Sequence, residues 1–177
     1  HGPGVQVNPI PILDGTKEFN EVVLDDVFVP DDLVLGEVGR GWAQNTNELS
    51  YERGGPDRWL STFGVVEAFI ATLDPNAVEP TTRHALGRLV ARFWGLRNLS
   101  LSVARMIDTG GAPSVESALV KEMATRFEQD SIIVLSELAD LEPSPESTVL
   151  FERLFASATL TGPAFTIRGG TSEILRS

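Results

Sequence analysis

The stretch LGRLVARFWGLRNLSLSVARM, residues 86–106, carries the clearest structural signal in this chain. Its apolar residues recur mostly at steps of three or four, which brings them onto one face of an α-helix. Gly110 and Gly111 follow the stretch and are typical of a helix end. The spacing therefore predicts a long amphipathic helix, whose core-facing residues are Leu86, Leu89, Val90, Phe93, Leu96, Val103 and Met106.

Helical spacing continues on both sides of this stretch. A first helix is expected over about residues 38–73, with a kink or break at the Gly-Gly-Pro sequence of residues 54–56. A third helix is expected from Pro113 onward, and a fourth over about residues 145–158. The sum is a mainly α protein, an antiparallel four-helix bundle preceded by a short β segment. Further core positions are expected at Trp42, Leu49, Phe63, Val66 and Ile70 in the first helix, and at Val115, Leu119, Met123, Phe127, Val134 and Leu138 in the third.

Residues 5–34 have the pattern of strands rather than of helices. β-Branched and aromatic residues lie there between Pro, Gly, Asn and Asp, as in VQVNPIPIL and FNEVVLDDVFVP. Two or three strands alone make a poor sheet, because they bury little surface and leave open edges. We therefore expect the strands of residues 1–36 to need partner strands that this sequence does not contain, and residues 37–177 to be helical.

The composition restricts the classes of function. The 177 residues carry a formal net charge of −11, which argues against binding along nucleic acid phosphates or on an anionic lipid surface. The absence of cysteine excludes disulfides and thiolate catalysis, and with only His1 and His84 as imidazoles a metal site is not expected. No stretch resembles a signal peptide or a membrane span of about 20 apolar residues, so a cytoplasmic protein is expected.

The last stretch, TIRGGTSEILRS at residues 166–177, combines a glycine pair with the start of a short helix. Gly169 and Gly170 can take backbone angles that other residues avoid, and they let a ligand come close to the main chain. Thr171 or Ser172 is then expected to cap the helix, whose free N–H groups suit an anionic or electron-rich ligand. By itself, the stretch is more often a simple helix cap after a loop.

Three stretches in this order resemble one family. EFNEVVLDDVFVPDDLVLGEVGRGW at residues 18–42, LSYERGG at residues 49–55 and IRGGTSEI at residues 167–174 are similar to the C-terminal half of acyl-CoA dehydrogenases. These flavoenzymes of lipid metabolism, for example in fatty acid β-oxidation, make an α,β double bond in a coenzyme A thioester. The resemblance implies that residues up to 36 end the middle β domain and that the rest forms the C-terminal helical domain. It also implies FAD as cofactor, an acyl-CoA thioester as substrate, an electron-transferring flavoprotein as acceptor, and a homo- or hetero-oligomer.

The resemblance further assigns a cofactor-binding turn. Arg168, Gly169, Gly170, Thr171 and Glu173 match the family turn that passes beside the flavin and the thioester. Main-chain groups and the threonine hydroxyl can hydrogen-bond to the cofactor there. Many members carry the catalytic glutamate at the position of Gly169, and this chain lacks that carboxylate.

A base is still required, because removing a proton α to the thioester carbonyl needs a positioned carboxylate. Some members place this glutamate on the first long helix of the bundle. Glu52 in LSYERGG matches that position, and Arg53 matches a family arginine beside it. We therefore expect Glu52 and Arg53 in the catalytic site, with Glu52 as the base and its pKa raised by partial desolvation when substrate binds. The alternative is an ordinary solvated glutamate paired with Arg53 or Arg58.

Two family motifs are not visible in this chain. The Arg-x-x-Phe-Gly sequence, through which many members contact FAD across the dimer, is absent from the region of the second helix. The Gln-x-x-Gly-Gly sequence of the family is absent from the stretch before the last turn. The contacts to adenine and pyrophosphate are therefore open, and the 177 residues alone are expected to be inactive. An alternative to the dehydrogenase is a non-catalytic pairing subunit, or a helical interaction domain, that completes the flavin site of a partner.

Overall fold

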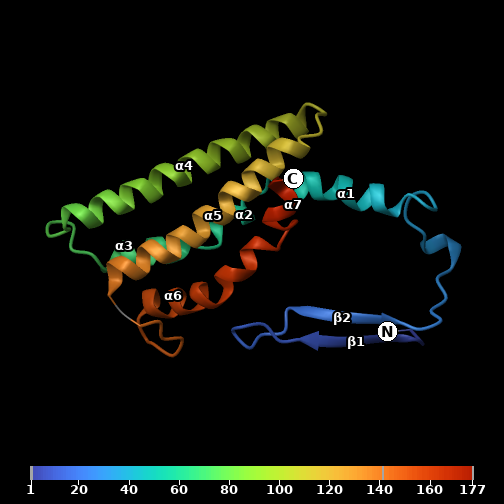
Figure 1. Cartoon of the computed structure of the whole chain (residues 1–177), viewed down its shortest axis with the longest axis horizontal. Coiled ribbons are helices and arrows are strands. Elements are labelled where there is room, and N and C mark those ends of the chain that lie inside the picture. Colours follow the sequence, from blue (N-terminus) through green and yellow to red (C-terminus); the bar gives the residue numbers. More distant parts are fainter. Residues whose placement is uncertain (1, 141, 177) are drawn as a thin grey trace. The chain divides into compact units, whose positions relative to one another are not determined.

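The computed structural model describes residues 2–140 and 142–176, which form two compact units (Figure 1). The N-terminal unit ends at Thr46, and the helical unit begins at Asn47. The helix α1 (Gly41–Glu52) contains this division, so its last turn belongs to the helical unit. The domain division expected after residue 36 stays a prediction.

The N-terminal unit contains a two-stranded antiparallel hairpin. Strand β1 (Val5–Ile10) pairs with β2 (Phe19–Leu24) in a register that puts Val5 opposite Leu24 and Ile10 opposite Phe19. A short 3₁₀ turn, η1 (Asp31–Leu33), follows. Large apolar side chains are exposed throughout this unit, including Phe28 and Leu35. The strand prediction is confirmed, and the described hairpin buries little surface of its own.

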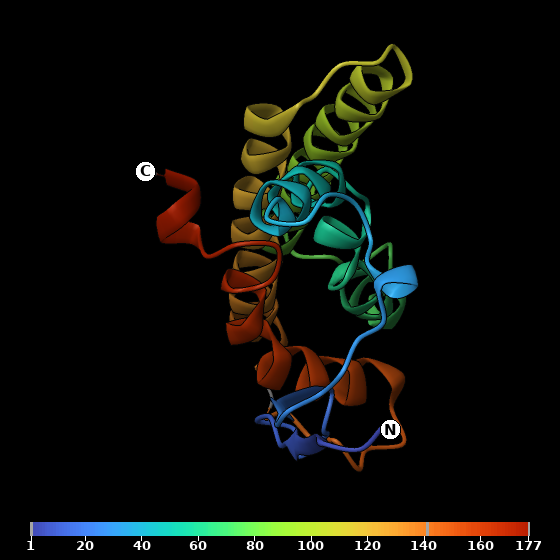
Figure 2. The same ribbon diagram turned by 90° about the vertical axis from the view of Figure 1, so that its right-hand side faces the viewer.

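In the described part of the helical unit, a helix broken into shorter pieces is followed by the continuous helices α4, α5 and α6 and by the short elements η2 and α7. In Figure 1, α4 and α5 run side by side in opposite directions, and Figure 2 shows the same pair from another side. Helix α6 packs against α3, and α5 contacts the other helices of the bundle. The antiparallel bundle predicted from the spacing is confirmed. Its elements are α2 (Asp57–Leu60), α3 (Phe63–Thr72), α4 (Pro80–Asp108), α5 (Ser114–Ala139), α6 (Leu150–Thr161), η2 (Gly162–Thr166) and α7 (Ser172–Arg176).

The predicted break at residues 54–56 separates α1 from α2. Gly54 is buried there against α4, where Ser100 Oγ donates a hydrogen bond of 2.6 Å to its carbonyl oxygen. A Cβ at Gly54 would lie only 2.5 Å from Cγ1 of Val103. The glycine therefore allows the chain to turn while the main chain touches α4.

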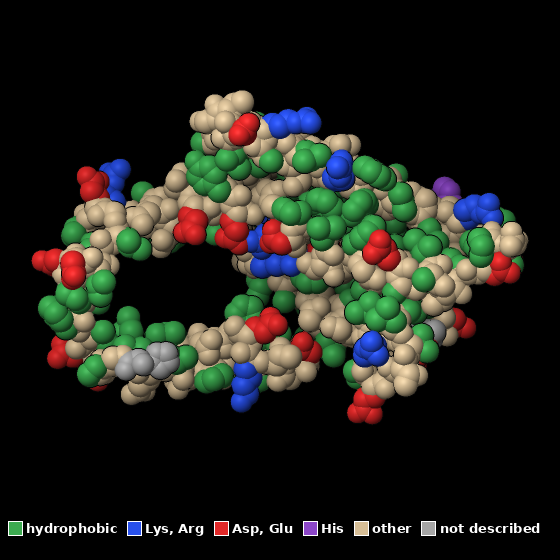
Figure 3. All heavy atoms as spheres, turned by 180° about the vertical axis from the view of Figure 1, so that it is seen from behind, with side chains coloured by type: hydrophobic (Ala, Val, Ile, Leu, Met, Phe, Trp, Pro, Cys, Tyr) green, Lys and Arg blue, Asp and Glu red, His purple; other side chains and the backbone are tan. Residues whose placement is uncertain are grey.

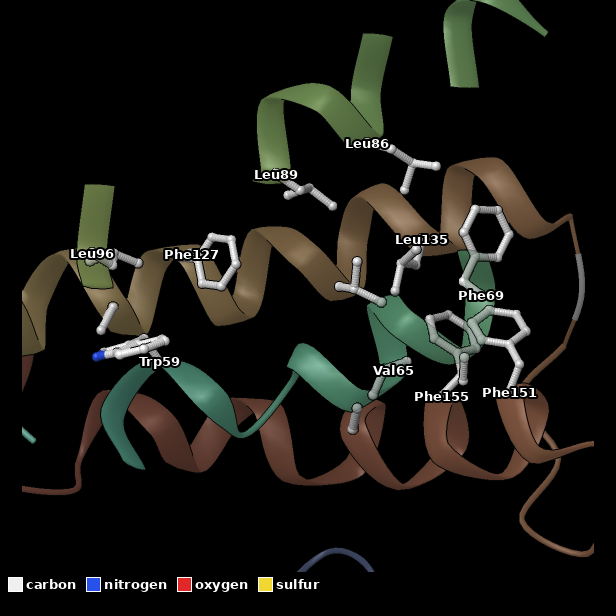
Figure 4. Packing of buried hydrophobic residues seen from close by; sticks show 14 of the residues in the cluster. Trp59, Val65, Phe69, Leu86, Leu89, Leu96, Phe127, Leu135, Phe151 and Phe155 are labelled. Atoms are coloured by element: carbon white, nitrogen blue, oxygen red, sulfur yellow. The ribbon is translucent and has the colours of Figure 1, made fainter. Parts of the chain in front are cut away.

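The core joins all four parts of the bundle (Figure 4). Val65 and Phe69 of α3 point toward Phe151 and Phe155 of α6, and Leu135 of α5 lies beside them. Leu89 and Leu96, two of the core residues predicted on α4, are buried in the same cluster. Apolar side chains from segments far apart in the sequence thus leave water together, which is the main stabilising contribution to such a bundle.

Several predicted core positions are wrong. Trp42 is 83% exposed, and Ile70 and Val90 are also exposed. On α5 the first part of the predicted stripe, Val115, Leu119 and Met123, is exposed, because a face with several polar residues is buried there instead. Val134 and Leu138, farther along the stripe, pack against the core as predicted. Phe127 is buried as predicted.

The fourth helix begins later than predicted. It starts at Leu150 rather than near Pro145, and it continues to Thr161, beyond the expected end at Ala158. Ser147 lies just before the helix, where its Oγ accepts a hydrogen bond of 3.0 Å from the N–H of Val149 and donates one of 2.5 Å to Glu152.

Among the described residues, no helix combines the length and the apolar character needed to cross a membrane. Figure 3 shows hydrophobic side chains on the surface of the helical unit, interspersed with acidic and basic ones. The expected cytoplasmic location stays a prediction.

Candidate functional site

The end of α1 and the turn before α7 meet in the helical unit, although they are 116 residues apart in the chain. Arg53, which directly follows α1, donates a hydrogen bond of 2.6 Å from Nε to the carbonyl oxygen of Gly169. The two motifs LSYERGG and IRGGTSEI thus form one structural feature, which no local pattern shows.

The turn before α7 depends on its two glycines. Gly169 and Gly170 have φ angles of 66° and 104°, as expected for residues in a region that other amino acids avoid. A Cβ at Gly169 would lie 3.3 Å from Cζ of Arg58, and a Cβ at Gly170 would lie 3.1 Å from Nη2 of Arg53. Both positions therefore need glycine for their backbone angle and for the arginine packed against them.

Thr171 is the residue that caps α7. Its Oγ1 accepts a hydrogen bond of 3.3 Å from the N–H of Ile174, so of the two expected capping residues the structure selects Thr171 over Ser172. Ser172 is buried, whereas Glu173 is exposed in the first turn of the helix. Glu173, a residue of the expected cofactor-binding set, thus lies at the surface.

Glu52 is the last residue of α1, and its side chain is 51% exposed. Its Oε1 forms an ion pair with Nη2 of Arg58, a residue of α2 whose side chain is only 6% exposed. Of the two partners considered from the sequence, the structure thus pairs Glu52 with Arg58, while Arg53 binds the turn. The role of Glu52 as a base stays a prediction.

A second ion pair holds the residue that precedes the two glycines of the turn. Glu128 of α5 is fully buried and pairs with Arg168, the residue before the glycines. Its Oε1 also accepts a hydrogen bond of 2.9 Å from the N–H of Ser61. Arg168 donates a 2.9 Å hydrogen bond to Oγ of Ser61, and its guanidinium lies 4.4 Å from the centre of the Phe165 ring. Arg168 is therefore fixed by both its charge and its flat face.

Two more polar side chains of α5 bind the segment before the turn. Lys121 is fully buried and donates a 3.0 Å hydrogen bond from Nζ to the carbonyl oxygen of Thr166. Thr125 donates a 3.1 Å bond to the carbonyl oxygen of Phe165. These contacts tie η2 to α5, so the position of the turn relative to the bundle is set by α5.

Burial shifts the pKa values of these groups. Desolvation raises the pKa of Glu128, although Arg168 and the hydrogen bonds from Ser61 oppose the shift. Desolvation lowers the pKa of Arg58, and the nearby positive charge of Arg168 lowers it further. The pKa of Lys121 is lowered mainly by its burial. Charged groups with shifted pKa values are thus concentrated around the turn, as is frequent at functional sites.

Apolar spacing alone does not predict the buried polar face of α5. Ser117, Lys121, Thr125 and Glu128 follow one another at steps of four, four and three, which is helical spacing. That regular spacing of polar residues is the signal that could have revealed the face.

The expected site residues do not line the cavities between α4 and α5. One of these, a groove of about 590 Å³, is lined by Arg92, Leu96, Leu99, Met123 and others. Within the described part of the chain, no three His, Asp or Glu side chains are placed to hold a metal ion. The candidate site is therefore the Gly169–Gly170 turn, together with Arg53, Arg58 and Arg168 beside it.

Comparisons with known proteins identify relatives of the chain. No family model matches it. The acyl-CoA dehydrogenase FadE34 of Mycobacterium tuberculosis is 28% identical over 98% of this chain and 24% of its own length. The acyl-CoA dehydrogenase IpdE1 of the same organism is 32% identical over 99% of this chain and 46% of its own length.

A similar solved structure supports the fold. The G363A variant of the steroid ACAD Tcur3481-Tcur3483 superposes with a TM-score of 0.81 at 24% identity, covering 98% of this chain and 47% of that one. This chain thus spans less than half the length of each of these proteins. The chain belongs to the acyl-CoA dehydrogenase family and corresponds to roughly the C-terminal half of its full-length members.

Proposed function

We propose that this chain is part of an FAD-dependent acyl-CoA dehydrogenase in which Glu52 removes the α-proton of an acyl-CoA thioester. The observation that carries the proposal is the meeting of the end of α1 with the Gly169–Gly170 turn, through Arg53 and Arg58. These are the two segments on which the resemblance allows a catalytic glutamate. A carboxylate on either segment can therefore serve the same reacting carbon.

The donors at the turn are suited to one edge of a flavin. The Oγ1 of Thr171 accepts a hydrogen bond from Ile174, so the hydroxyl proton of Thr171 is left to donate to a ligand. Arg53, Arg58 and Arg168 lie at this turn, where Glu52 and Asp57 pair with Arg58 and Glu128 pairs with Arg168. In the proposal, Thr171 and the main chain of the turn hold the flavin ring, and bound FAD supplies the acceptor for a hydride from the β carbon.

The side chain of Glu52 is half-exposed, so a substrate that binds from outside can reach its carboxylate. Its carboxylate takes the proton from the α carbon, and with loss of a hydride from the β carbon the product is the trans-2-enoyl-CoA. The neighbouring Arg53 keeps the end of α1 against the turn, so the distance between base and cofactor surface is constrained. An electron-transferring flavoprotein as acceptor belongs to the same proposal, because the resemblance implies one.

A second candidate function is that of a pairing subunit without chemistry of its own. It is favoured by the two missing family motifs. The similar steroid ACAD Tcur3481-Tcur3483 is also named for two polypeptides, so an assembly of unlike chains is a reasonable second proposal. In that case the helical unit would complete the flavin site of a partner chain.

The deciding experiment uses the full-length protein purified alone. Its visible absorption spectrum reports bound flavin, and anaerobic addition of a panel of acyl-CoA thioesters reports reduction by bleaching. We expect bleaching with one class of thioester, and loss of bleaching with retained flavin in Glu52→Gln. The control is Glu48→Gln, which removes an exposed carboxylate one turn earlier on α1 and is expected to bleach like the unchanged protein.

Two results would contradict the dehydrogenase proposal. Full bleaching of Glu52→Gln would remove Glu52 from its role as base. A colourless protein that stays colourless with added FAD, and gains flavin only with a second polypeptide, would favour the pairing subunit.

A further inference from the structure

Arg58 is the residue that connects the proposed base with the turn. Its guanidinium pairs with Glu52 on one side and lies against Gly169 on the other. The turn carbonyl of Gly169 is meanwhile bound by Arg53. Arg58 appears in none of the three stretches that carry the family resemblance.

The environment of Arg58 is a poor one for a guanidinium. The side chain is 94% buried, and its Nε has no hydrogen-bond partner among the described residues, although Oδ2 of Asp57 lies 3.1 Å away. Burial and the second cation, Arg168, both lower its pKa, so both act against its charge. Burying the charge of Arg58 costs free energy, and its ion pair with the half-exposed carboxylate of Glu52 adds little stability.

The Arg58 guanidinium occupies the space beside position 169, which favours glycine there. A Cβ at Gly169 would approach Cζ, Nη1 and Nη2 of Arg58 at 3.3, 3.4 and 3.5 Å. A longer side chain at position 169 would therefore compete with the guanidinium for the same volume. Glycine at 169 and arginine at 58 fit together as a pair.

The turn cannot easily move away from Arg58. Glu128 binds Arg168 from within the bundle, and Arg168 also donates a 3.4 Å hydrogen bond to the carbonyl oxygen of Arg58. Lys121 fixes the carbonyl of Thr166 just before it. The groups around the Arg58 guanidinium are thus Glu52, Asp57, Glu128 and Arg168, and they are held by α1, α2, α5 and the turn.

We propose that Arg58 is a positioning residue, which holds the Glu52 carboxylate beside the Gly169–Gly170 turn and occupies the volume that a side chain at position 169 would need. The inference rests on the proposed function, because it assigns Arg58 a role through Glu52. It predicts that Arg58 matters for the proton-transfer step more than for binding of the thioester.

The test uses the full-length, flavin-loaded protein and the thioester that bleaches it. Arg58→Met removes the charge and Arg58→Lys keeps it. Glu48→Gln is the control, because it removes an exposed carboxylate one turn before Glu52 on α1. Two rates are measured: flavin bleaching after anaerobic mixing, and exchange of the substrate α-proton in D₂O, which reports on the base alone. Thermal unfolding is recorded for each variant.

We expect Arg58→Met to slow both rates by about 10²-fold with little change in KM, because a carboxylate displaced by about 1 Å loses that much. Arg58→Lys should recover part of the rate, since an ammonium still attracts Glu52 but lacks the planar fork. Glu48→Gln should stay close to the unchanged protein.

The bleaching rate constant is read only from flavin-loaded molecules, so a variant that folds poorly reduces the amplitude and leaves the rate constant interpretable. Unchanged rate constants in both Arg58 variants, with an inactive Glu52→Gln, would overturn the role of Arg58 alone. Activity in Glu52→Gln as well would instead overturn the proposed function.

Discussion

At the scale of single residues, Gly169 has two reasons to be glycine that act together. Its φ of 66° is unfavourable for other residues, and its missing side chain leaves room for Arg58. Gly169→Ala is therefore expected to lower the free energy of unfolding by about 1–3 kcal/mol in urea titrations. Gly87→Ala is the control: nothing lies within 4 Å of its Cβ position inside α4, so it should raise stability by roughly 0.5–1 kcal/mol. Equal stability of both variants would contradict the described turn.

Glu128 and Glu122 lie on the same helix but have pKa values shifted in opposite directions. Burial raises the pKa of Glu128 above its ordinary value of 4.5, despite Arg168. For Glu122, burial alone would raise the pKa, but hydrogen bonds from Arg176, Ser172 and Arg126 outweigh it and lower the pKa. A raised pKa contributes stability below the unfolded pKa that is lost as the pH rises through the folded one, and a lowered pKa does the opposite.

This difference predicts two pH dependences. Relative to the unchanged chain, Glu128→Gln should gain stability as the pH rises from about 4 to about 7, because the destabilising ionisation is removed. Glu122→Gln should lose stability over the same range, because the favourable ionised form is absent. Unfolding free energies from urea titrations at a series of pH values measure both, and parallel curves for the two variants would contradict the assigned environments.

At the scale of elements, α5 decides how the bundle is organised. Apolar spacing alone selects the face with Val115, Leu119 and Met123, whereas the structure buries the face with Lys121 and Glu128. Two substitutions on this helix distinguish the faces. Leu135→Ala should lower the free energy of unfolding by about 2–5 kcal/mol, because it leaves a cavity at a fully buried position.

The matched substitution Leu119→Ala should change that free energy by only about 0.5 kcal/mol, because the side chain is 51% exposed. Urea titration of both variants is the measurement. A larger loss for Leu119→Ala than for Leu135→Ala would mean that α5 is rotated about its axis relative to the described structure.

At the scale of the whole molecule, the helical unit contains its own hydrophobic core. Every residue of the buried apolar cluster lies between Trp59 and Ala158, and none comes from the hairpin. A chain of residues 41–177 is therefore expected to keep its helical circular dichroism and to unfold cooperatively on heating. A gradual loss of signal would show that the helical unit needs the preceding residues for its stability.

The sequence by itself determined the family, the antiparallel bundle, the break at residues 54–56 and the glycine turn. These features depend on order, spacing and backbone freedom, which are local properties of the chain. Only the tertiary structure decided that Glu52 pairs with Arg58, that Arg53 binds the turn and that Glu128 holds Arg168. Such polar groups can be buried only where a distant segment supplies a matching charge or carbonyl, and that partner is set by packing rather than by neighbouring residues.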